Sequence, residues 1–598
     1  MTKTTSPNNT GSPATVEPRT LQWWEQQLLE RQGCTASDWE RVLVHPDCDL
    51  TLIHNVDFEG DVRIGLLDSA LWPGCGLRSA RVIDCRLADG VRVRNIGRYL
   101  RNVTLEEGAV IEDTSRVEFQ PEAFCGVGTV VSVLDETGSR PVVIYPGMSA
   151  QSAMLMARIP LMAEEEFIPQ VQAHADEHPL PLSIAAGAKI LGCGSIVNVH
   201  VGPEVTIEGA RSLANGAVIN NAAPGRCLAY VGPGVDADGF IIEDGVADSG
   251  ALLRNVFVGQ GARLEKGFTA HDSLFFANCS MENGEACALF AGPYTVSMHK
   301  GTLLIGCQTS FMNAGSSTNQ SNHMYKLGPV HWGVLERGVK TSSNSYLMLG
   351  ANIGAFSLLM GQHKTHPDST EFPFSYLFGD AQGATVVVPA MMLRSCGLMR
   401  DETKWPTRDR RLKRRLPMHD RINFEVLNPY TVDRILTAMH TIDGLLKLPA
   451  DDDRYIRYKG MKISRASLER ARKLYAVATF KYLSLKLKEG RFPESHDAGN
   501  ATEAEKWIDL GGQLLPVSVL KKAIEAESVQ QREAILDEAM ENYTALEYDW
   551  ILRRFPEEWR KSAEYIAESA AEFDRIVDND RTTYRESLQA ETDMLALL

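Results

Sequence analysis

Aliphatic side chains recur at every sixth position over long stretches of the sequence, and this spacing restricts the possible folds more than any other feature. The spacing occurs in these groups: Val56 and Val62; Leu87 and Val93; Leu105 and Ile111; Ile184, Ile190 and Ile196; Val201, Ile207 and Leu213; Phe240, Val246, Leu252, Val258 and Leu264. Such a period matches neither the helical period of about 3.6 residues nor the alternation of a long strand. It is typical of hexapeptide repeats, which fold into a parallel β-helix.

In such a coil, one aliphatic side chain per face points inward, and small or polar residues occupy the corners between short strands. Glycine, asparagine and aspartate fill many of the intervening positions here. The phase slips by one residue between Ile196 and Val201 and again after Leu213, where we expect corner loops to absorb the change. The alternative for this pattern is a β-sandwich with evenly spaced turns.

The chain is long enough for several domains, since 598 residues exceed what one hydrophobic core normally supports. The pattern predicts a mainly β plus α protein, a parallel β-helix with a helical insert and a C-terminal α-helical domain. Its expected parts are a disordered tail (1–18), a helical N-terminal cap (19–50), a first β-helix segment with a hairpin at Val130–Tyr145 (51–147), a helical insert (148–182), the main β-helix with the candidate site (183–400) and an α-helical domain (401–598).

Several helices can be placed by their caps and apolar faces. The cap is expected to contain one helix with an apolar face of Trp23, Trp24, Leu28 and Leu29, and a second turn, begun by Thr35 or Ser37, that carries Trp39, Val42 and Leu43. The insert is expected to break near Pro160 and Pro169. Asn428 and Pro429 predict the start of a later helix.

Composition excludes several classes of protein. The net charge of −16 argues against a nucleic-acid partner, because phosphate contacts require a basic surface. The 11 scattered cysteines contain no CxxC pair, which argues against a disulfide framework, and Cys287 is flanked by apolar residues that indicate a core thiol. The N-terminus lacks the apolar stretch of a signal peptide, and no apolar run approaches the length of a membrane span. A cytoplasmic protein without a membrane partner is expected.

Five of the 14 histidines fall between His299 and His366, among asparagines, lysines and glycines on predicted turns and short strands. An imidazole can remove a proton from a hydroxyl or amine that attacks a thioester, while amides and ammonium groups stabilise developing charge. We therefore predict a catalytic group and a substrate-binding group in this segment. The catalytic candidates are His323, Asn322, Lys326, His331 and Asn319, with His323 as the general base, and the substrate-binding candidates are Tyr325, His299 and Asn313. The alternative is a β-helix corner whose polar side chains satisfy backbone groups.

A second pattern in this segment is typical of a metal site. His363, His366 and Asp368 form an H-x-x-H-x-D string, and imidazole and carboxylate are the usual ligands of Zn²⁺ and Fe²⁺. The same spacing before a Pro-Asp turn is equally natural in a solvated loop.

A basic run at 408–415 stands out in an acidic protein. Guanidinium groups match phosphate oxygens, so Arg410, Arg411 and Arg414 are predicted to hold the phosphates of a substrate. The alternative is pairing of this run with the acidic C-terminal helices.

The stretch DSLFFANCSMENGEACALFAGPYTVSMHKGTLLIG, continued by FMNAGSSTNQSNHMYKLGPVHWG and FSLLMGQHKTHPDS, resembles the DUF4954 family of bacterial hexapeptide-repeat proteins. The resemblance extends over most of the chain and implies a left-handed β-helix with a helical C-terminal region, but no activity. More distantly, the repeat is similar to those of hexapeptide acyltransferases and sugar nucleotidyltransferases. That similarity implies a homo-oligomer, with a trimer favoured, and a histidine acting as base in a groove between coils.

Together these patterns favour a transferase of the hexapeptide-repeat type. It would move an acyl or related group onto a sugar, a nucleotide-sugar or a phosphorylated small molecule. Acetyl-CoA or another acyl donor and a divalent metal are the candidate cofactors. Two alternatives stay open, a non-catalytic β-helix scaffold that binds a ligand or partner, and a metal-dependent β-helix enzyme.

Overall fold

The fold is mixed α/β and is dominated by a large, mostly parallel β-sheet accompanied by helices. The computed structural model describes residues 17–321, 332–449, 454–488, 504–555 and 563–596. The chain divides into two compact units: Met1–Cys125 with Leu180–Val218, and Gly126–Pro179 with Ile219–Leu598. Within the described residues, no helix has the length and apolar content needed to cross a lipid bilayer.

The first unit consists mainly of short strands, with one α-helix and two short 3₁₀ helices near its N-terminal end. Its helices are α1 (Trp23–Arg31) and the 3₁₀ helices η1 (Trp39–Arg41) and η2 (Leu50–Leu52). Its strands are β1 (Arg19–Thr20), β2 (Thr35–Ala36), β3 (Val42–Val44), β4 (Ile53–Glu59), β5 (Val62–Ile64), β6 (Gly76–Ile83), β7 (Arg86–Leu87), β8 (Arg92–Arg94), β9 (Tyr99–Arg101), β10 (Thr104–Leu105), β11 (Val110–Glu112), β12 (Arg116–Glu118), β15 (Ser183–Ile184), β16 (Lys189–Leu191), β17 (Ser195–Val201), β18 (Thr206–Glu208) and nearly all of β19 (Ser212–Ile219).

The second unit contains the remaining strands and most of the helices. Its strands are β13 (Val130–Ser132), β14 (Pro141–Val143), β20 (Tyr230–Val231), β21 (Asp236–Glu243), β22 (Val246–Ala247), β23 (Leu252–Val258), β24 (Arg263–Glu265), β25 (Thr269–Phe275), β26 (Ser280–Glu282), β27 (Glu285–Cys287), β28 (Phe290–Ala291), β29 (Val296–Ser297), β30 (Leu303–Ile305), β31 (Cys307–Thr309), β32 (Asn313–Ala314), β33 (Asn319–Ser321), β34 (Gly333–Leu335), β35 (Lys340–Thr341), β36 (Tyr346–Met348), β37 (Asn352–Ile353), β38 (Leu358–Met360), β39 (Gln362–His363), β40 (Tyr376–Gly379), β41 (Thr385–Val388), β42 (Tyr455–Tyr458), β43 (Met461–Ser464), β44 (Trp507–Leu510) and β45 (Gln513–Pro516). Its helices are α2 (Ala150–Arg158), α3 (Pro160–Met162), the π-helix η3 (Ala163–Phe167), α4 (Ile168–Glu177), the 3₁₀ helix η5 (Met391–Arg394), α5 (Cys396–Thr407), α6 (Arg410–Arg414), α7 (Pro429–Leu445), α8 (Arg465–Lys488), α9 (Val517–Ile524), α10 (Val529–Glu541), α11 (Tyr543–Arg554) and α12 (Ala563–Ala596).

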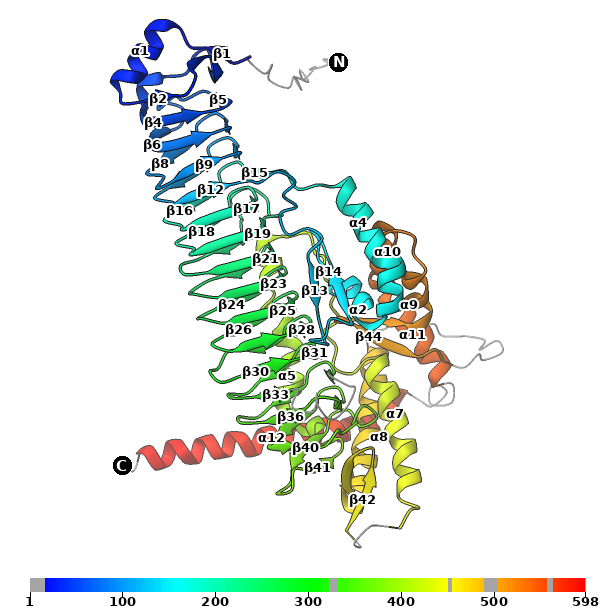
Figure 1. Cartoon of the computed structure of the whole chain (residues 1–598). Helices are drawn as coiled ribbons and strands as arrows, with labels where there is room; N and C mark the ends of the chain where they lie inside the picture. Colours follow the sequence, from blue (N-terminus) through cyan, green and yellow to red (C-terminus); the bar gives the residue numbers. More distant parts are fainter. Residues whose placement is uncertain (1–16, 322–331, 450–453, 489–503, 556–562, 597–598) are drawn as a thin grey trace, which may run out of the picture. The chain divides into compact units, whose positions relative to one another are not determined.

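The parallel strands of the second unit pair in long ladders. One ladder runs through β26, β29, β32, β35 and β38, a second through β28, β31, β34 and β37, and a third through β27, β30, β33, β36 and β39. Partners within a ladder are therefore separated in sequence by two other strands. Figure 1 shows strands such as β30, β33 and β36 lying one beside the next.

A column of buried side chains runs along the third ladder and the strands that precede it. Paired registers place Leu253, Ala270, Ala286, Leu304, Gln320, Leu347 and His363 in line. All of these side chains are buried. The predicted interior positions are confirmed for nearly every group, but Leu252 is 41% exposed and Leu253 takes the buried position. The phase therefore slips once more than the sequence pattern indicated.

The predicted elements agree with the structure in some places and differ in others. The hairpin is confirmed as the antiparallel pair β13 and β14, and α7 begins at Pro429 with Asn428 as its cap. The predicted break near Pro160 is confirmed by the start of α3 at that residue. The predicted break near Pro169 is wrong, because the chain continues as a helix from η3 into α4. The predicted C-terminal helical pattern is confirmed, with the hairpins β42–β43 and β44–β45 placed between its helices.

The N-terminal cap differs most from its prediction. Trp23 and Trp24 of the predicted apolar face are exposed on α1, whereas Leu29 of that face is buried as predicted. The second predicted helix is wrong, because Asp38 caps only the single 3₁₀ turn η1 and Val42 enters strand β3. A β-branched residue next to a short turn fits an extended strand better than a helix.

Each unit carries antiparallel strands beside its parallel ladders. In the first unit β1 pairs antiparallel with β3. In the second unit β41 pairs antiparallel with β40, the strand that follows β38 in its ladder, and β43 then pairs with β41.

Candidate functional site

A groove in the second unit combines positive charge with aromatic side chains. It has a volume of about 570 Å³ and is lined by the turns around β26, β29 and β32, by β35 and by the helices α5 and α6. We call it the basic groove, and its lining residues are Asn278, Ser280, Tyr294, Val296, Met298, His299, Phe311, Met312, Asn313, Lys340, Asp401, Lys404, Trp405, Arg408, Arg410 and Lys413. Five of them are cationic and one is a carboxylate, so the groove attracts anions.

A buried ion pair holds the short helix α6 in place. Asp409 caps the helix by accepting a hydrogen bond from the backbone N–H of Arg411. The Arg411 guanidinium also donates to Asp409 at 2.8 Å and to the Asp420 carbonyl at 2.9 Å. Burial acts to raise the pKa of Asp409, but the hydrogen bonds and charge of Arg411 outweigh it and hold that pKa below its usual range. Arg411 therefore stabilises the helix and is not available to a ligand.

Arg410 connects α6 to the turns of the sheet. Its guanidinium donates to the carbonyls of Gly261 and Cys279 and to Ser280 Oγ, and its backbone N–H donates to Asn278 Oδ1. Burial and the nearby charge of Arg263 lower the pKa of Arg410. Arg410 lines the groove, but its donors are largely occupied by the protein.

The helical period separates the residues of the basic run. Residues three apart lie near one another on the surface of a helix, which places Arg410 and Lys413 on the groove side of α6. Arg410 and Lys413 line the groove, whereas Arg411 is buried. Arg414 is exposed and is not part of the groove lining.

Aromatic rings form one wall of the groove. The rings of Tyr294 and Phe311 stack with centroids 5.6 Å apart, and Trp405 of α5 lies 4.7 Å from Phe311. Tyr294 and Phe311 both have positive φ angles, of 59° and 51°, which are uncommon for bulky residues. The same left-handed backbone recurs at Phe356 and Phe374, so it is a feature of the corners between strands and is not particular to the groove.

Polar side chains lie along the strand side of the groove. His299 and Asn313 are exposed there, and Lys340 of β35 forms an ion pair with Asp401 of α5. The predicted residues His299, Asn313 and Arg410, which are distant in sequence, are therefore brought together. Asn319 lies in β33 outside the groove lining, and its buried Oδ1 has no hydrogen-bond partner among the residues that the structure describes. The predicted residues Asn322, His323, Tyr325, Lys326 and His331 lie outside the described residues.

The proposed metal ligands point to different partners. His363 is fully buried in the aliphatic column with Nδ1 at 3.0 Å from Thr385 Oγ1, and burial lowers its pKa to about 4. His366 Nδ1 lies 2.8 Å from the Leu349 carbonyl, and Asp368 accepts hydrogen bonds from Thr370. Within the part of the chain that the structure describes, no group of three His, Cys, Asp or Glu side chains is arranged to hold a metal ion. The spacing of the string does not make these residues converge, because His363 occupies an inward-facing strand position.

Several groove residues were not singled out from the sequence. Lys340, Lys404 and Trp405 come from elements that the sequence pattern did not bring together, while Arg408 and Lys413 belong to the basic run. The sequence signal that could have identified Lys413 is Asp409, a residue type that caps helices. A cap at this position sets the first residue of α6, and the helical period then sets the side of the helix on which each following cation lies.

Comparison with known proteins assigns the chain to a family. A family model described as "Domain of unknown function (DUF4954)" matches residues 19–446. The chain is a member of the DUF4954 family.

The DUF4954 match includes every residue that lines the basic groove. One relative, described as "Uncharacterized protein" of Treponema pallidum (strain Nichols), is 23% identical over an alignment of 472 positions that covers 72% of this chain and 62% of the relative. The chain thus spans less than two thirds of that relative's length. Neither description names an activity, so the chemistry of this DUF4954 protein has to be inferred from its own residues.

Proposed function

We propose that this DUF4954 protein is a transferase of the hexapeptide-repeat type that acts on a phosphorylated or nucleotide-linked small molecule bound in the basic groove. The single observation that carries the proposal is the groove itself, in which five cationic side chains lie beside Trp405, His299 and Asn313. Cations match phosphate oxygens, and an aromatic face can stack on a nucleobase. The volume of about 570 Å³ lies within the range of about 300–1,000 Å³ typical of small-molecule sites.

In this proposal, His299 is the proton acceptor within the groove. The acceptor hydroxyl or amine transfers its proton to the imidazole as its oxygen or nitrogen attacks the carbonyl carbon of an acyl thioester. The new ester or amide bond forms as the C–S bond breaks, and the proton passes to the leaving thiolate. Asn313 is suited to donate a hydrogen bond to the developing oxyanion. His323 stays a sequence-based candidate for the same role.

The proposal also concerns the architecture. We infer that the three parallel ladders are the faces of a left-handed parallel β-helix related to the hexapeptide acyltransferases, and that the chain forms a homo-oligomer, with a trimer favoured. The support is the regular separation of paired strands and the column of buried side chains. Small-angle scattering and mass measurement in solution test the subunit number.

A non-catalytic ligand-binding module is the second candidate. A general base is normally oriented by a third group, and among the described residues no hydrogen bond to the ring of His299 is present. A module of this kind would use the same cations and aromatic wall but would not turn over its ligand.

Thermal-shift screening tests the binding step. The full-length protein is screened against acetyl-CoA, a UDP-sugar and a sugar phosphate, since a ligand at about 100 times its dissociation constant adds about 2.7 kcal/mol to stability. Lys413→Gln should weaken binding of the phosphorylated ligand about tenfold. The matched control is Arg414→Gln on the same helix, which should bind as the wild type does. Equal affinities of the two variants, or no shift with any ligand, would contradict the proposal.

Turnover separates the two candidates. Release of free CoA thiol from acetyl-CoA is followed with the acceptor that gives the largest thermal shift. A transferase shows CoA release that His299→Gln reduces by about a hundredfold or more while ligand affinity stays within about twofold. Binding without any CoA release by the wild type supports the module instead.

A further inference from the structure

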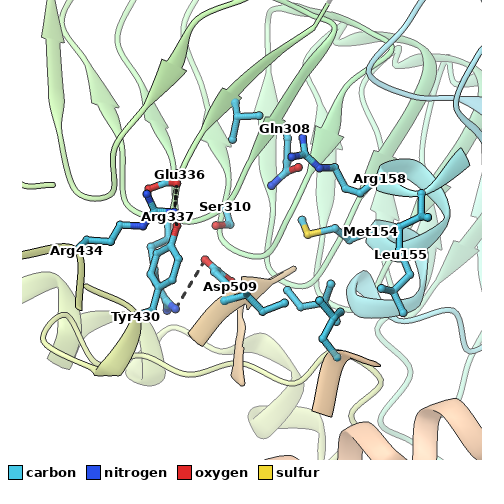
Figure 2. A pocket seen from close by; sticks show the side chains of 15 residues that line it. Met154, Leu155, Arg158, Gln308, Ser310, Glu336, Arg337, Tyr430, Arg434 and Asp509 are labelled. Atoms are coloured by element: carbon cyan, nitrogen blue, oxygen red, sulfur yellow. Dashed lines mark hydrogen bonds and ion pairs between the residues drawn. The ribbon is translucent and has the colours of Figure 1, made fainter. Parts of the chain in front are cut away.

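The second unit contains a second cavity, whose Arg337 lies over the ring of Phe311 in the basic groove at 4.9 Å. It has a volume of about 290 Å³ and is formed by α2, α7, α9, β44, the strands β31 and β34 and residues that follow these two strands. We call it the arginine cavity, and its lining residues are Met154, Leu155, Arg158, Ile159, Gln308, Ser310, Val334, Glu336, Arg337, Tyr430, Arg434, Ile508, Asp509, Leu510 and Leu520. Figure 2 shows these side chains converging from the sheet and from the helices.

Two of the three arginines in this cavity are held by the protein. Arg434 pairs with Glu336 at 2.9 Å and donates to the carbonyl of Thr370 and to Tyr430 Oη. Burial raises the pKa of Glu336, although the charge of Arg434 opposes the shift. Glu336 also accepts a hydrogen bond from the backbone of Ala355. This end of the cavity is therefore a closed network.

Arg337 is buried but incompletely paired. Its side chain is 0% exposed, and it donates from Nη2 to the Asn423 carbonyl. Its Nη1 lies 3.7 Å from Asp509, which also accepts a hydrogen bond from the backbone of Gly512. Among the described residues, Nε and Nη1 of Arg337 have no hydrogen-bond partner. A buried cation with so few partners is costly unless further negative charge lies nearby.

Arg158 is the third arginine of the cavity. It is the last residue of α2, and Figure 2 shows it extending toward Gln308. Within the part of the chain that the structure describes, its guanidinium has no ion pair or hydrogen bond. Three guanidiniums thus face two carboxylates, Glu336 and Asp509, and one positive charge remains.

Most of the remaining lining is apolar, and the exceptions are Gln308 and Ser310. Met154 and Leu155 of α2 lie beside Arg158 in Figure 2, and Ile508 and Leu510 of β44 contribute to the apolar lining together with Leu520 of α9. Such a wall buries the hydrocarbon body of a ligand. One free cation next to an apolar surface fits a ligand with one negative charge better than a phosphate dianion.

We propose that the arginine cavity binds a small carboxylic acid with an apolar body, whose carboxylate pairs with Arg158 and whose hydrocarbon part lies against Leu155, Ile508 and Leu520. The carboxylate adds negative charge near the under-paired Arg337. A guanidinium accepts a carboxylate in a bidentate geometry, which would orient the ligand. This site is separate from the basic groove, and its occupancy does not depend on the transferase proposal.

Calorimetric titration of the full-length protein with hexanoate tests this site. Hexanoate should bind saturably, while hexanamide, which has the same shape without the charge, should bind at least about tenfold more weakly. Arg158→Gln should weaken hexanoate binding about tenfold to a hundredfold, and Arg158→Lys should recover part of the affinity. Leu520→Trp, which fills the apolar end, should weaken hexanoate and hexanamide alike.

The matched control is Arg98→Gln, which removes an exposed arginine from the first unit and should leave hexanoate binding unchanged. Thermal denaturation of every variant verifies that it is folded. The proposal is overturned if hexanoate shows no saturable binding, if hexanamide binds equally well, or if Arg158→Gln binds as the wild type does. Tighter binding of inorganic phosphate than of hexanoate at this site would also overturn it.

Discussion

Replacement of His363 by leucine should remove an acid-sensitive contribution to stability. His363 is fully buried in the aliphatic column, and burial lowers its pKa to about 4. A histidine in an unfolded chain titrates near about pH 6.5. Because the unfolded state then binds more protons, the free energy of unfolding falls as the pH drops below about 6.5, and the loss is complete below about 4. The difference between the two pKa values corresponds to about 3 kcal/mol.

At neutral pH the same substitution should have a small effect. It removes one hydrogen bond, worth about 1 kcal/mol, and replaces an imidazole by an apolar side chain in line with Leu347. Thr385 keeps the neighbouring hydroxyl of Thr365 at 3.4 Å. We therefore expect His363→Leu to change the free energy of unfolding by less than about 1.5 kcal/mol at pH 7. Between neutral pH and about pH 4, the variant should lose up to about 3 kcal/mol less of its unfolding free energy than the wild type loses.

Urea unfolding followed by tryptophan fluorescence between about pH 7 and pH 4 measures both effects. The control is His440→Leu, which alters an exposed histidine on α7 and should leave the pH dependence unchanged. An unchanged acid dependence in His363→Leu would refute the assignment of a buried neutral imidazole. Zinc analysis of the same preparations adds a second test: stoichiometric zinc that is lost in this variant would show that the residue is a metal ligand after all.

Three further outcomes follow from the packing and charge of the second unit. Leu253→Ala should reduce the free energy of unfolding by about 2–5 kcal/mol, whereas Leu252→Ala should change it by less than about 1 kcal/mol. Urea titrations in which Leu252→Ala is the more destabilised variant would contradict the assignment of Leu253 to the core. Arg411→Met should destabilise by about 3–5 kcal/mol because it leaves Asp409 buried without its partner, and the double variant with Asp409→Asn should be less destabilised than the single one in the same assay. Cys287 should resist iodoacetamide in the folded protein at about pH 8, because burial and a nearby carboxylate raise the pKa of its thiol to about 12; peptide mapping that finds rapid alkylation would contradict this.

The six-residue period predicted the strands well because it reflects one physical requirement, an inward aliphatic side chain on each short strand. Ile184, Ile190 and Ile196 are all buried, as the pattern requires. It failed at Leu252, which is exposed while its neighbour Leu253 occupies the inward position. Two adjacent leucines give the sequence no signal of which one faces inward.

The candidate site was predictable only in part. His299 follows β29 and Asn313 begins β32, the next strand of the same ladder, so their proximity is a consequence of the repeat. Arg410 joins them through the docking of α6, which depends on the buried contacts of Asp409 and Arg411. Those long-range contacts leave no periodic trace in the sequence. The H-x-x-H-x-D string was misleading for a related reason, because a histidine can be chosen for an interior position where it never meets a ligand.

The reversal of strand direction at β41 closes the end of the ladder that runs through β38 and β40. β41 occupies the hydrogen-bonding edge of β40, β43 adds to β41 in parallel, and β42 pairs antiparallel with β43. An unpaired parallel edge offers a template on which another copy of the same chain can add. A fragment cut before Thr385 would expose that edge and polymerise, so recombinant pieces of this protein intended for crystallisation or binding studies should extend at least through residue 464.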